Sequence, residues 1–440
     1  MNFITARIER LATFVFLLIA AGVFWPPDSY LVSDHMAHQG ASNFYDFSAF
    51  VALAVFLVIA FAARWQETLR LLRCAWPVLV LIGFAFVSAF WSEDPSLVLR
   101  RSGTVAITSL FGVYLVGRSD FADLIALLVK VYAVAMIASL TVIVVAPSVA
   151  IGGNETYAWA WRGAFSDKNT LGLACALTMI VSAYAFHNSY GPRWLAVVAI
   201  LTALVAFKLA ESKTPLVVMV AAAYAAVFAA MLRRRDGFGL GVGFILGVLG
   251  LAGIFAFALD SAAILEAIGR DPTFTNRAKI WHYASIYIAH HPWLGVGFGS
   301  FWRTDGVEAN EAWALIEFKT PHAHNAWLEL GLGMGYVGMG LVALSWLAAF
   351  YRVARMLTAP AARHVAFCLA LLVGIFLENM TEYEFFRPND ILWVLFVVTV
   401  VYLGRAALTA RAARPAYRVP VAKPLARRPA AALSVRPLAP

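Results

Sequence analysis

Residues 124–146 have the sequence LIALLVKVYAVAMIASLTVIVVA, in which Lys130 is the only charged residue. An apolar stretch of this length can cross the ~30 Å hydrocarbon core of a bilayer as a single helix. Similar stretches recur along the chain: 62% of its 440 residues are hydrophobic, 13% are charged, and the mean hydropathy is +0.77. A soluble domain needs a polar surface and has about 25% charged residues. The composition therefore predicts an all-α polytopic membrane protein and excludes a cytosolic enzyme, a disordered chain and a nucleic-acid-binding domain.

The apolar stretches predict about twelve transmembrane helices. The expected spans are 11–25, 47–63, 74–91, 102–117, 124–146, 170–187, 194–210, 215–232, 238–259, 324–350, 364–379 and 390–404. The chain then divides into residues 1–259 with nine spans, a long loop over 260–323, residues 324–404 with three spans, and a tail over 405–440. This tail is basic and rich in Pro and Ala, and we expect it to be disordered.

Basic residues are distributed unequally between the two sides of this topology. The side that holds both termini carries 21 of the 34 Lys and Arg residues but 5 of the 25 acidic residues. Basic loops of membrane proteins remain in the cytoplasm. We therefore expect cytoplasmic termini and tail, and we expect the loop over 260–323 on the opposite, outward face.

The outward loop ends beside the residue that we expect to carry the chemistry. Residues 277–290 have helical spacing and predict a helix along the membrane surface. His324 follows in the segment Pro321-His322-Ala323-His324-Asn325, where the tenth span begins. Free N–H groups at a helix start disfavour a charged imidazole, so a neutral His324 could take a proton from a hydroxyl. Asn325 could orient the ring by a hydrogen bond.

Other interpretations of this region stay open. His324 could be a capping or boundary residue. Four histidines could bind a metal, although their spacing suits a strand better than a helix, and we expect no metal. These residues are His290, His291, His322 and His324. Glycines in the tenth span predict close approach of a helix or a ligand, or else simple helix packing. They are Gly331, Gly333, Gly335, Gly338 and Gly340.

Positive charge also occurs on the outward side, where the topology should deplete it. The residues are Arg100, Arg101, Arg162, Lys168, Lys213, Arg277 and Arg387. Each alone could anchor a helix at the interface, but together they predict an anion site, because Arg and Lys both bind phosphate. The chain has no Walker or dinucleotide loop, and no cofactor is expected. A transferase here would need an activated, membrane-bound donor such as a polyprenyl diphosphate sugar.

Several motifs resemble the bacterial O-antigen ligase family. His324-Asn325, nine residues, Gly335, two residues and Gly338 match its histidine pattern. Arg162-Gly163-Ala164-Phe165-Ser166-Asp167-Lys168-Asn169 resembles a second family stretch. Asn276-Arg277 with Trp281, and Pro292-Trp293-Leu294-Gly295-Val296-Gly297, resemble its loop motifs. The resemblance covers about residues 90–390.

The resemblance implies a metal-independent glycosyl transfer at the periplasmic face of the bacterial inner membrane. The donor would be a glycan on undecaprenyl diphosphate, and the acceptor would be lipid A–core. His324 would be the base, while Arg277 and Lys213 would hold the diphosphate; many members have Arg at the latter position. In-line attack with one base would invert the anomeric carbon. Substrate contacts are expected at Arg162, Lys168, Asn169, His322 and Asn325.

Two alternative functions remain. O-antigen and exopolysaccharide polymerases share this core and use a second lipid-linked glycan as acceptor. A polysaccharide flippase or transporter would also have about twelve spans and cationic cavity residues. It would not need a histidine at a loop-to-helix junction, and it would be expected to show two related halves, which we do not find.

The charge asymmetry predicts the outcome of a topology experiment. A reporter fused near residue 300 should be periplasmic, and one fused after residue 410 should be cytoplasmic, because basic loops are retained inside. Paired alkaline phosphatase and green fluorescent protein fusions measure this. A cytoplasmic residue 300 would contradict a periplasmic glycosyl transfer.

Overall fold

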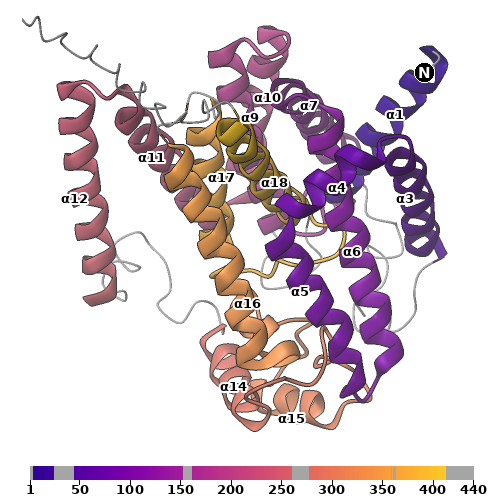
Figure 1. Ribbon diagram of the computed structural model, residues 1–440. Coiled ribbons are helices and arrows are strands. Elements are labelled where there is room, and N and C mark those ends of the chain that lie inside the picture. The colour runs from indigo at the N-terminus through magenta and orange to yellow at the C-terminus, as the bar shows by residue number, and fades with distance from the viewer. Residues whose placement is uncertain are drawn as a thin grey trace, which may run out of the picture.

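The computed structural model describes residues 3–23, 44–151, 161–259, 277–357, 359 and 363–412. These residues form helices and no β-strand; an isolated bridge pairs Ile151 with Trp161. Figure 1 shows long helices side by side in a bundle, with α14 and α15 gathered at one end. The predicted all-α membrane fold is therefore confirmed.

Each predicted span overlaps one helix of the bundle. The helices are α1 (Phe3–Ala20), α3 (Phe44–Ala62), α4 (Trp65–Cys74), α5 (Trp76–Val87), a 3₁₀ turn (Ser88–Phe90), α6 (Pro95–Arg118), α7 (Phe121–Val145), α8 (Pro147–Ala150), α9 (Lys168–Asn188), α10 (Arg193–Ala210), α11 (Thr214–Arg234), α12 (Gly237–Leu259), α14 (Arg277–His290), α15 (Val307–Ile316), α16 (Ala326–Met356), α17 (Val365–Glu378) and α18 (Ile391–Ala412).

Among the described helices, six are long and apolar enough to cross a membrane. They are α7, α9, α10, α11, α16 and α18. A seventh candidate is the pair Ser48–Ala62 and Trp65–Cys74, which is bent by 110°. The structure thus shows a multi-pass membrane protein, while the count of twelve crossings stays a prediction.

The helix α18 lies at the centre of the core. Of its most apolar window, 78% is buried, and it packs against α6, α16 and α17. An apolar surface on all sides suits such a central position. The tail was predicted to be disordered from residue 405, but the helix continues to Ala412 and Arg405 donates to the carbonyl of Val116 at 2.8 Å. The rest of the predicted tail, 413–440, and the start of the outward loop, 260–276, lie outside the described residues.

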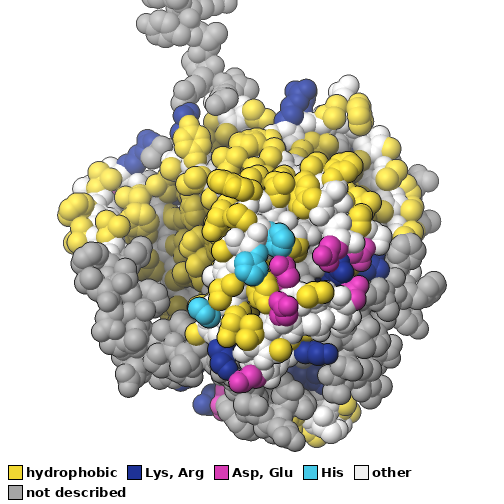
Figure 2. Space-filling view, turned by 90° about the horizontal axis from the view of Figure 1, so that it is seen from below, with side chains coloured by type: hydrophobic (Ala, Val, Ile, Leu, Met, Phe, Trp, Pro, Cys, Tyr) yellow, Lys and Arg dark blue, Asp and Glu magenta, His cyan; other side chains and the backbone are white. Residues whose placement is uncertain are grey.

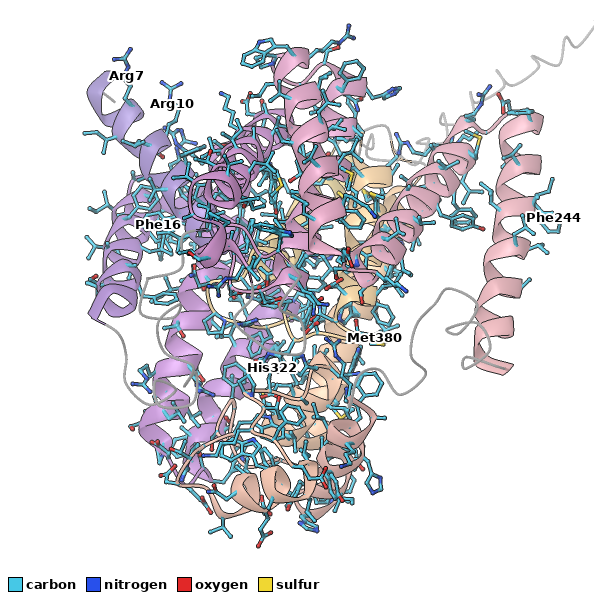
Figure 3. All side chains as sticks on the ribbon, turned by 180° about the vertical axis from the view of Figure 1, so that it is seen from behind. Arg7, Arg10, Phe16, Phe244, His322 and Met380 are labelled. Atoms are coloured by element: carbon cyan, nitrogen blue, oxygen red, sulfur yellow. The ribbon has the colours of Figure 1, made fainter. Side chains whose placement is uncertain are left out.

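The two ends of the bundle carry different groups. Figure 3 places Arg7 and Arg10 at one end, and His322 and Met380 toward the end where α14 and α15 lie. At the first end Arg118 forms an ion pair with Glu9, and Arg64 donates to the carbonyl of Gly117. This separation agrees with the charge distribution of the predicted topology. The direction in which the bundle crosses the membrane stays a prediction.

The helix α16 is sharply bent at Gly335. This residue has φ +62° and ψ −165°, which ends one helical segment at Met334 and starts another at Tyr336. Trp327 of the first segment and Trp346 of the second both contact Phe376 of α17, with ring centroids 6.2 and 5.2 Å away. The two segments therefore fold toward each other. At ~1.5 Å per residue the second segment is still about 30 Å long, enough to cross the bilayer core.

The backbone of residues 292–297 fills this bend. Two N–H groups and two carbonyls of this loop bond to residues on either side of Gly335. The pairs are Val296 N–Leu332 O at 3.1 Å, Gly297 N–Gly333 O at 2.9 Å, Tyr336 N–Pro292 O at 2.7 Å and Val337 N–Trp293 O at 3.2 Å. Polar groups that a broken helix leaves unpaired are satisfied in this way. Backbone does approach Gly333 and Gly335 closely, but it belongs to this loop and not to the helix or ligand that the sequence predicted.

Replacing Gly335 by Ala should destabilise the fold. A Cβ atom there would lie 2.4 Å from the carbonyl of Trp293, and the positive φ already disfavours a side chain. We expect a loss of about 3 kcal/mol or more, seen as a lower melting temperature of the purified protein. Gly340→Ala is the matched control, because no atom lies within 4 Å of its Cβ position. Equal melting temperatures for the two variants would contradict this account of the bend.

Candidate active site

Glu382, in the segment between α17 and α18, is the centre of a polar cluster. Its Oε1 accepts hydrogen bonds from Nη2 of Arg277 at 2.5 Å and from Nδ2 of Asn169 at 3.1 Å. Its Oε2 lies 2.9 Å from Nδ1 of His324. The guanidinium of Arg277 also donates to the carbonyl of Thr381. One carboxylate thus brings together the starts of α9 and α14 and the segment before α16.

The environment of Glu382 keeps its carboxyl group ionised. Burial alone would raise its pKa, since only 12% of the side chain is exposed. The hydrogen bond from His324 and the positive charge of Arg277 outweigh burial and lower the pKa to about 2. Glu382 is therefore an anion throughout the neutral range.

The ring of His324 is hydrogen-bonded through Nδ1, and Nε2 has no hydrogen-bond partner among the residues that the structure describes. An ionised carboxylate only accepts hydrogen bonds, so Nδ1 of His324 carries a hydrogen and donates it to Glu382. The backbone has φ +48°, and 26% of the side chain is exposed. The neighbouring Ala323 is fixed on both sides, because its carbonyl accepts from Trp281 and its N–H donates to Glu329. His324 thus has the geometry of an oriented base.

His322 differs from His324 in its surroundings. Burial lowers the pKa of His322 well below its ordinary value, and the nearby charges of His324, Arg387 and Arg277 lower it further. Its Nδ1 accepts the backbone N–H of His324 at 3.2 Å, which requires an unprotonated nitrogen. The two rings lie 4.2 Å apart. His322 is thus a neutral neighbour that shapes the backbone at His324.

Asn325 does not orient the ring as expected from the sequence. Its Oδ1 accepts from the N–H groups of Trp327 and Leu328 at 2.9 and 3.2 Å, so it caps α16. Its Nδ2 donates to the carbonyl of Met380 at 3.0 Å. The prediction was wrong because the start of a helix has free N–H groups that an Asn side chain satisfies directly.

The two lysines of the predicted site lie at the starts of helices that border the cluster. Lys168 begins α9 immediately before Asn169. Lys213 precedes α11 and follows Ser212, whose hydroxyl donates to Oδ1 of Asn169 at 3.0 Å. Ser212 and Asn169 therefore connect Lys213 to Glu382 through two hydrogen bonds. Lys168 and Lys213 are each adjacent in sequence to a residue of this hydrogen-bonded chain, Asn169 and Ser212 respectively.

Arg162 occupies a different position. Its Nε donates to the carbonyl of Val149 at 3.0 Å, and its Nη1 donates to the carbonyl of Ser166 at 3.3 Å. The guanidinium thus ties the end of α8 to the turn before α9. A substrate contact by Arg162 stays a prediction.

The four histidines considered for a metal fall into two separate groups. His322 and His324 belong to the Glu382 cluster, whereas His290 and His291 lie 3.6 and 3.1 Å from Glu308. Figure 2 views this end of the molecule and shows histidine and acidic side chains next to each other on a largely apolar surface. Within the described part of the chain, no group of three His, Cys, Asp or Glu residues could hold a metal ion.

The sequence is similar to that of known proteins. Residues 195–343 match the family described as O-Antigen ligase. The resemblance to the O-antigen ligase family is confirmed. The match includes Lys213, Arg277, His322 and His324. The chain is also 26% identical over 354 residues to the exopolysaccharide production protein ExoQ of Rhizobium meliloti (strain 1021), which covers 72% of this chain and 78% of the relative. These similarities support an O-antigen ligase or polymerase-type membrane enzyme.

Glu382 was not identified from the sequence, and it lies outside the residues matched to the O-antigen ligase family. The sequence does contain a feature that points to Glu382. The segment after α17 contains Glu382 and Glu384, and the predicted topology places this segment on the same side as His324. Acidic residues next to a candidate base are candidates for orienting it.

Glu382→Gln should reduce glycan transfer by about 10²-fold or more. The amide keeps the size of the side chain but cannot stabilise a protonated His324 or neutralise Arg277, and loss of an orienting carboxylate has effects of this order. Glu317→Gln is the control, because that side chain is 78% exposed and pairs with Lys279. Initial rates of the purified variants measure the effect. A Glu382→Gln enzyme with wild-type turnover would remove this carboxylate from the mechanism.

Proposed function

We propose that this protein transfers a glycan from undecaprenyl diphosphate to an acceptor hydroxyl at the periplasmic face of the bacterial inner membrane. The observation that supports this most is the 2.9 Å contact between Glu382 and His324, with Arg277 on the same carboxylate. A base and a cationic group lie together there, as attack by a hydroxyl on a sugar diphosphate requires.

The proposed reaction needs one base and no separate acid. Nε2 of His324 takes the proton from the acceptor hydroxyl while its oxygen attacks the anomeric carbon. The bond from that carbon to the diphosphate oxygen breaks, and the diphosphate leaves with the electron pair. Attack opposite the leaving group inverts the anomeric carbon. Glu382 stabilises the imidazolium that forms, as a carboxylate does in other carboxylate–histidine pairs.

The departing diphosphate is assigned to the cationic side of the cluster. Arg277 binds phosphate through a planar fork, whereas Lys213 and Lys168 act as point charges. Asn169, between them and Glu382, is positioned to hold both the carboxylate and the substrate. His322 and Asn325 fix the backbone that carries His324.

The acceptor distinguishes two candidate functions. Lipid A–core as acceptor makes the protein a ligase in lipopolysaccharide maturation, as the family description of residues 195–343 suggests. A second lipid-linked glycan as acceptor makes it a polymerase. Similarity to an exopolysaccharide production protein over 354 residues favours this second function.

An assay with purified components separates these functions. Protein in nanodiscs receives one lipid-linked glycan as donor and either lipid A–core or a second lipid-linked glycan as acceptor. We expect product with one acceptor only, with inverted anomeric configuration and unchanged yield in the presence of a chelator. Product with retained configuration would contradict the single-base mechanism, and product with neither acceptor would contradict the proposed function.

His324→Ala should abolish transfer, whereas His322→Ala should have a milder effect. A positioned base contributes about 10²–10⁴-fold, and only His324 has a ring nitrogen fixed by Glu382. The wild-type rate should fall toward acid pH, because a protonated imidazole cannot accept the hydroxyl proton. Initial rates from pH 5 to 8 measure both effects, and donor binding serves as the folding control. Wild-type turnover in His324→Ala would exclude it as the base.

A further inference from the structure

Arg387 is a cation of the site region that the proposed mechanism does not use. It lies in the same segment as Glu382, and 42% of its side chain is exposed. Its Nη1 donates to the carbonyl of Tyr383 at 3.3 Å and to Oε2 of Glu384 at 2.9 Å. Both contacts use one nitrogen. The edge formed by Nε and Nη2, which can bind an oxyanion through two hydrogen bonds, has no partner among the described residues.

Arg277 is less exposed than Arg387. Only 15% of the Arg277 side chain is exposed, and it lies 2.5 Å from the ionised Glu382. The carboxyl partner of Arg387 is Glu384, whose pKa is shifted in the opposite direction from that of Glu382. Burial raises the pKa of Glu384 well above its ordinary value; Arg387 opposes this rise, and Asp390 adds to it. Glu384 is thus a weaker counter-charge for Arg387 than the ionised Glu382 is for Arg277.

Asp390 forms a side-chain hydrogen bond with Glu384 and also contacts the start of α18. Its Oδ1 accepts from the N–H groups of Leu392 and Trp393 at 2.8 and 3.2 Å, at the start of α18. The positive end of that helix therefore offsets the Asp390 charge.

Arg387 lies on the histidine side of the cluster. The ring of Tyr383 is 5.9 Å from the ring of His322, which is 4.2 Å from the ring of His324. Arg277, in contrast, approaches the cluster from α14 and bonds to Thr381 and Glu382. The two arginines thus contact successive parts of the 381–384 segment, beside the base.

We infer that Arg387 is a second anion-binding position of the active site and takes an oxyanion of the glycan substrate through its Nε–Nη2 edge. The oxyanion is either a phosphate of the donor or a carboxylate of an acidic sugar. This inference rests on the proposed function, because that function supplies a substrate with such groups.

Binding measurements without turnover test this position. Purified full-length protein in nanodiscs is titrated with inorganic diphosphate and, separately, with methyl glucuronide. The variants are Arg387→Ala, Arg387→Gln, which keeps a donor for the Tyr383 carbonyl, and Arg387→Lys, which keeps the charge. Arg363→Ala is the control, because this exposed arginine lies before α17, at the other end of that helix. Melting temperatures establish that each variant is folded.

The affinity of Arg387→Ala and Arg387→Gln should fall at least about tenfold for one probe, with a smaller loss in Arg387→Lys and none in Arg363→Ala. Wild-type binding should weaken as salt is added. An effect on diphosphate assigns Arg387 to the donor, and an effect on the glucuronide assigns it to an acidic sugar. Wild-type protein that binds neither probe, or affinities that Arg387→Ala leaves unchanged, would overturn the inference.

These experiments distinguish an error in the proposed function from an error in the anion position. A protein that binds diphosphate through Arg387 but transfers no glycan contradicts that function and leaves the anion position intact. An active enzyme whose Arg387→Ala variant binds both probes normally contradicts the anion position alone.

Discussion

The carboxylate of Glu382 ties together three segments that are far apart in the sequence. A buried charge costs free energy unless it is paired and hydrogen-bonded, and here Arg277, Asn169 and His324 supply the partners. Each partner comes from a different helix end, so none of these ends can shift without leaving part of the ion unpaired. The position of the base relative to the cationic residues therefore follows from one side chain that contacts both.

A second constraint comes from backbone polar groups, which must be paired where water is excluded. The bend at Gly335 interrupts α16, and the loop over 292–297 supplies the missing hydrogen bonds. The same requirement fixes the segment before α16, where Glu329 accepts from the N–H of Ala323 and from Trp302. Two motifs that are separated in the sequence, the loop and the glycine-containing helix, thus form one structural unit that supports His324.

Periodicity and residue type predicted some of these features and not others. The helix over 277–290 and the one that starts after Asn325 follow from the local spacing of apolar residues, and both are present. The pairing of His324 with Glu382 joins residues 58 positions apart and depends on how α16, α17 and α18 pack, which local pattern does not encode. For Asn325 a contact was predicted that does not form. Its side chain bonds to free backbone N–H groups within the next turn instead of to the imidazole ring. Glycines indicated a close approach, but not that a loop makes it.

The two histidines and the two arginines show how partners set the role of a side chain. His322 and His324 are chemically identical and 4.2 Å apart, but only His324 faces an anion that can stabilise its protonated form. Arg277 and Arg387 differ in the same way, because one faces a carboxylate that stays ionised and the other a carboxyl group whose pKa is raised by burial. In the proposed reaction, proton transfer to His324 adds a second full cation beside Glu382, whose charge Arg277 already shares. The single negative charge of Glu382 then interacts with both the imidazolium of His324 and the guanidinium of Arg277. Arg277 is therefore less neutralised when the diphosphate departs. Glu382 thereby couples the gain of a proton on the acceptor side to the stabilisation of negative charge on the donor side.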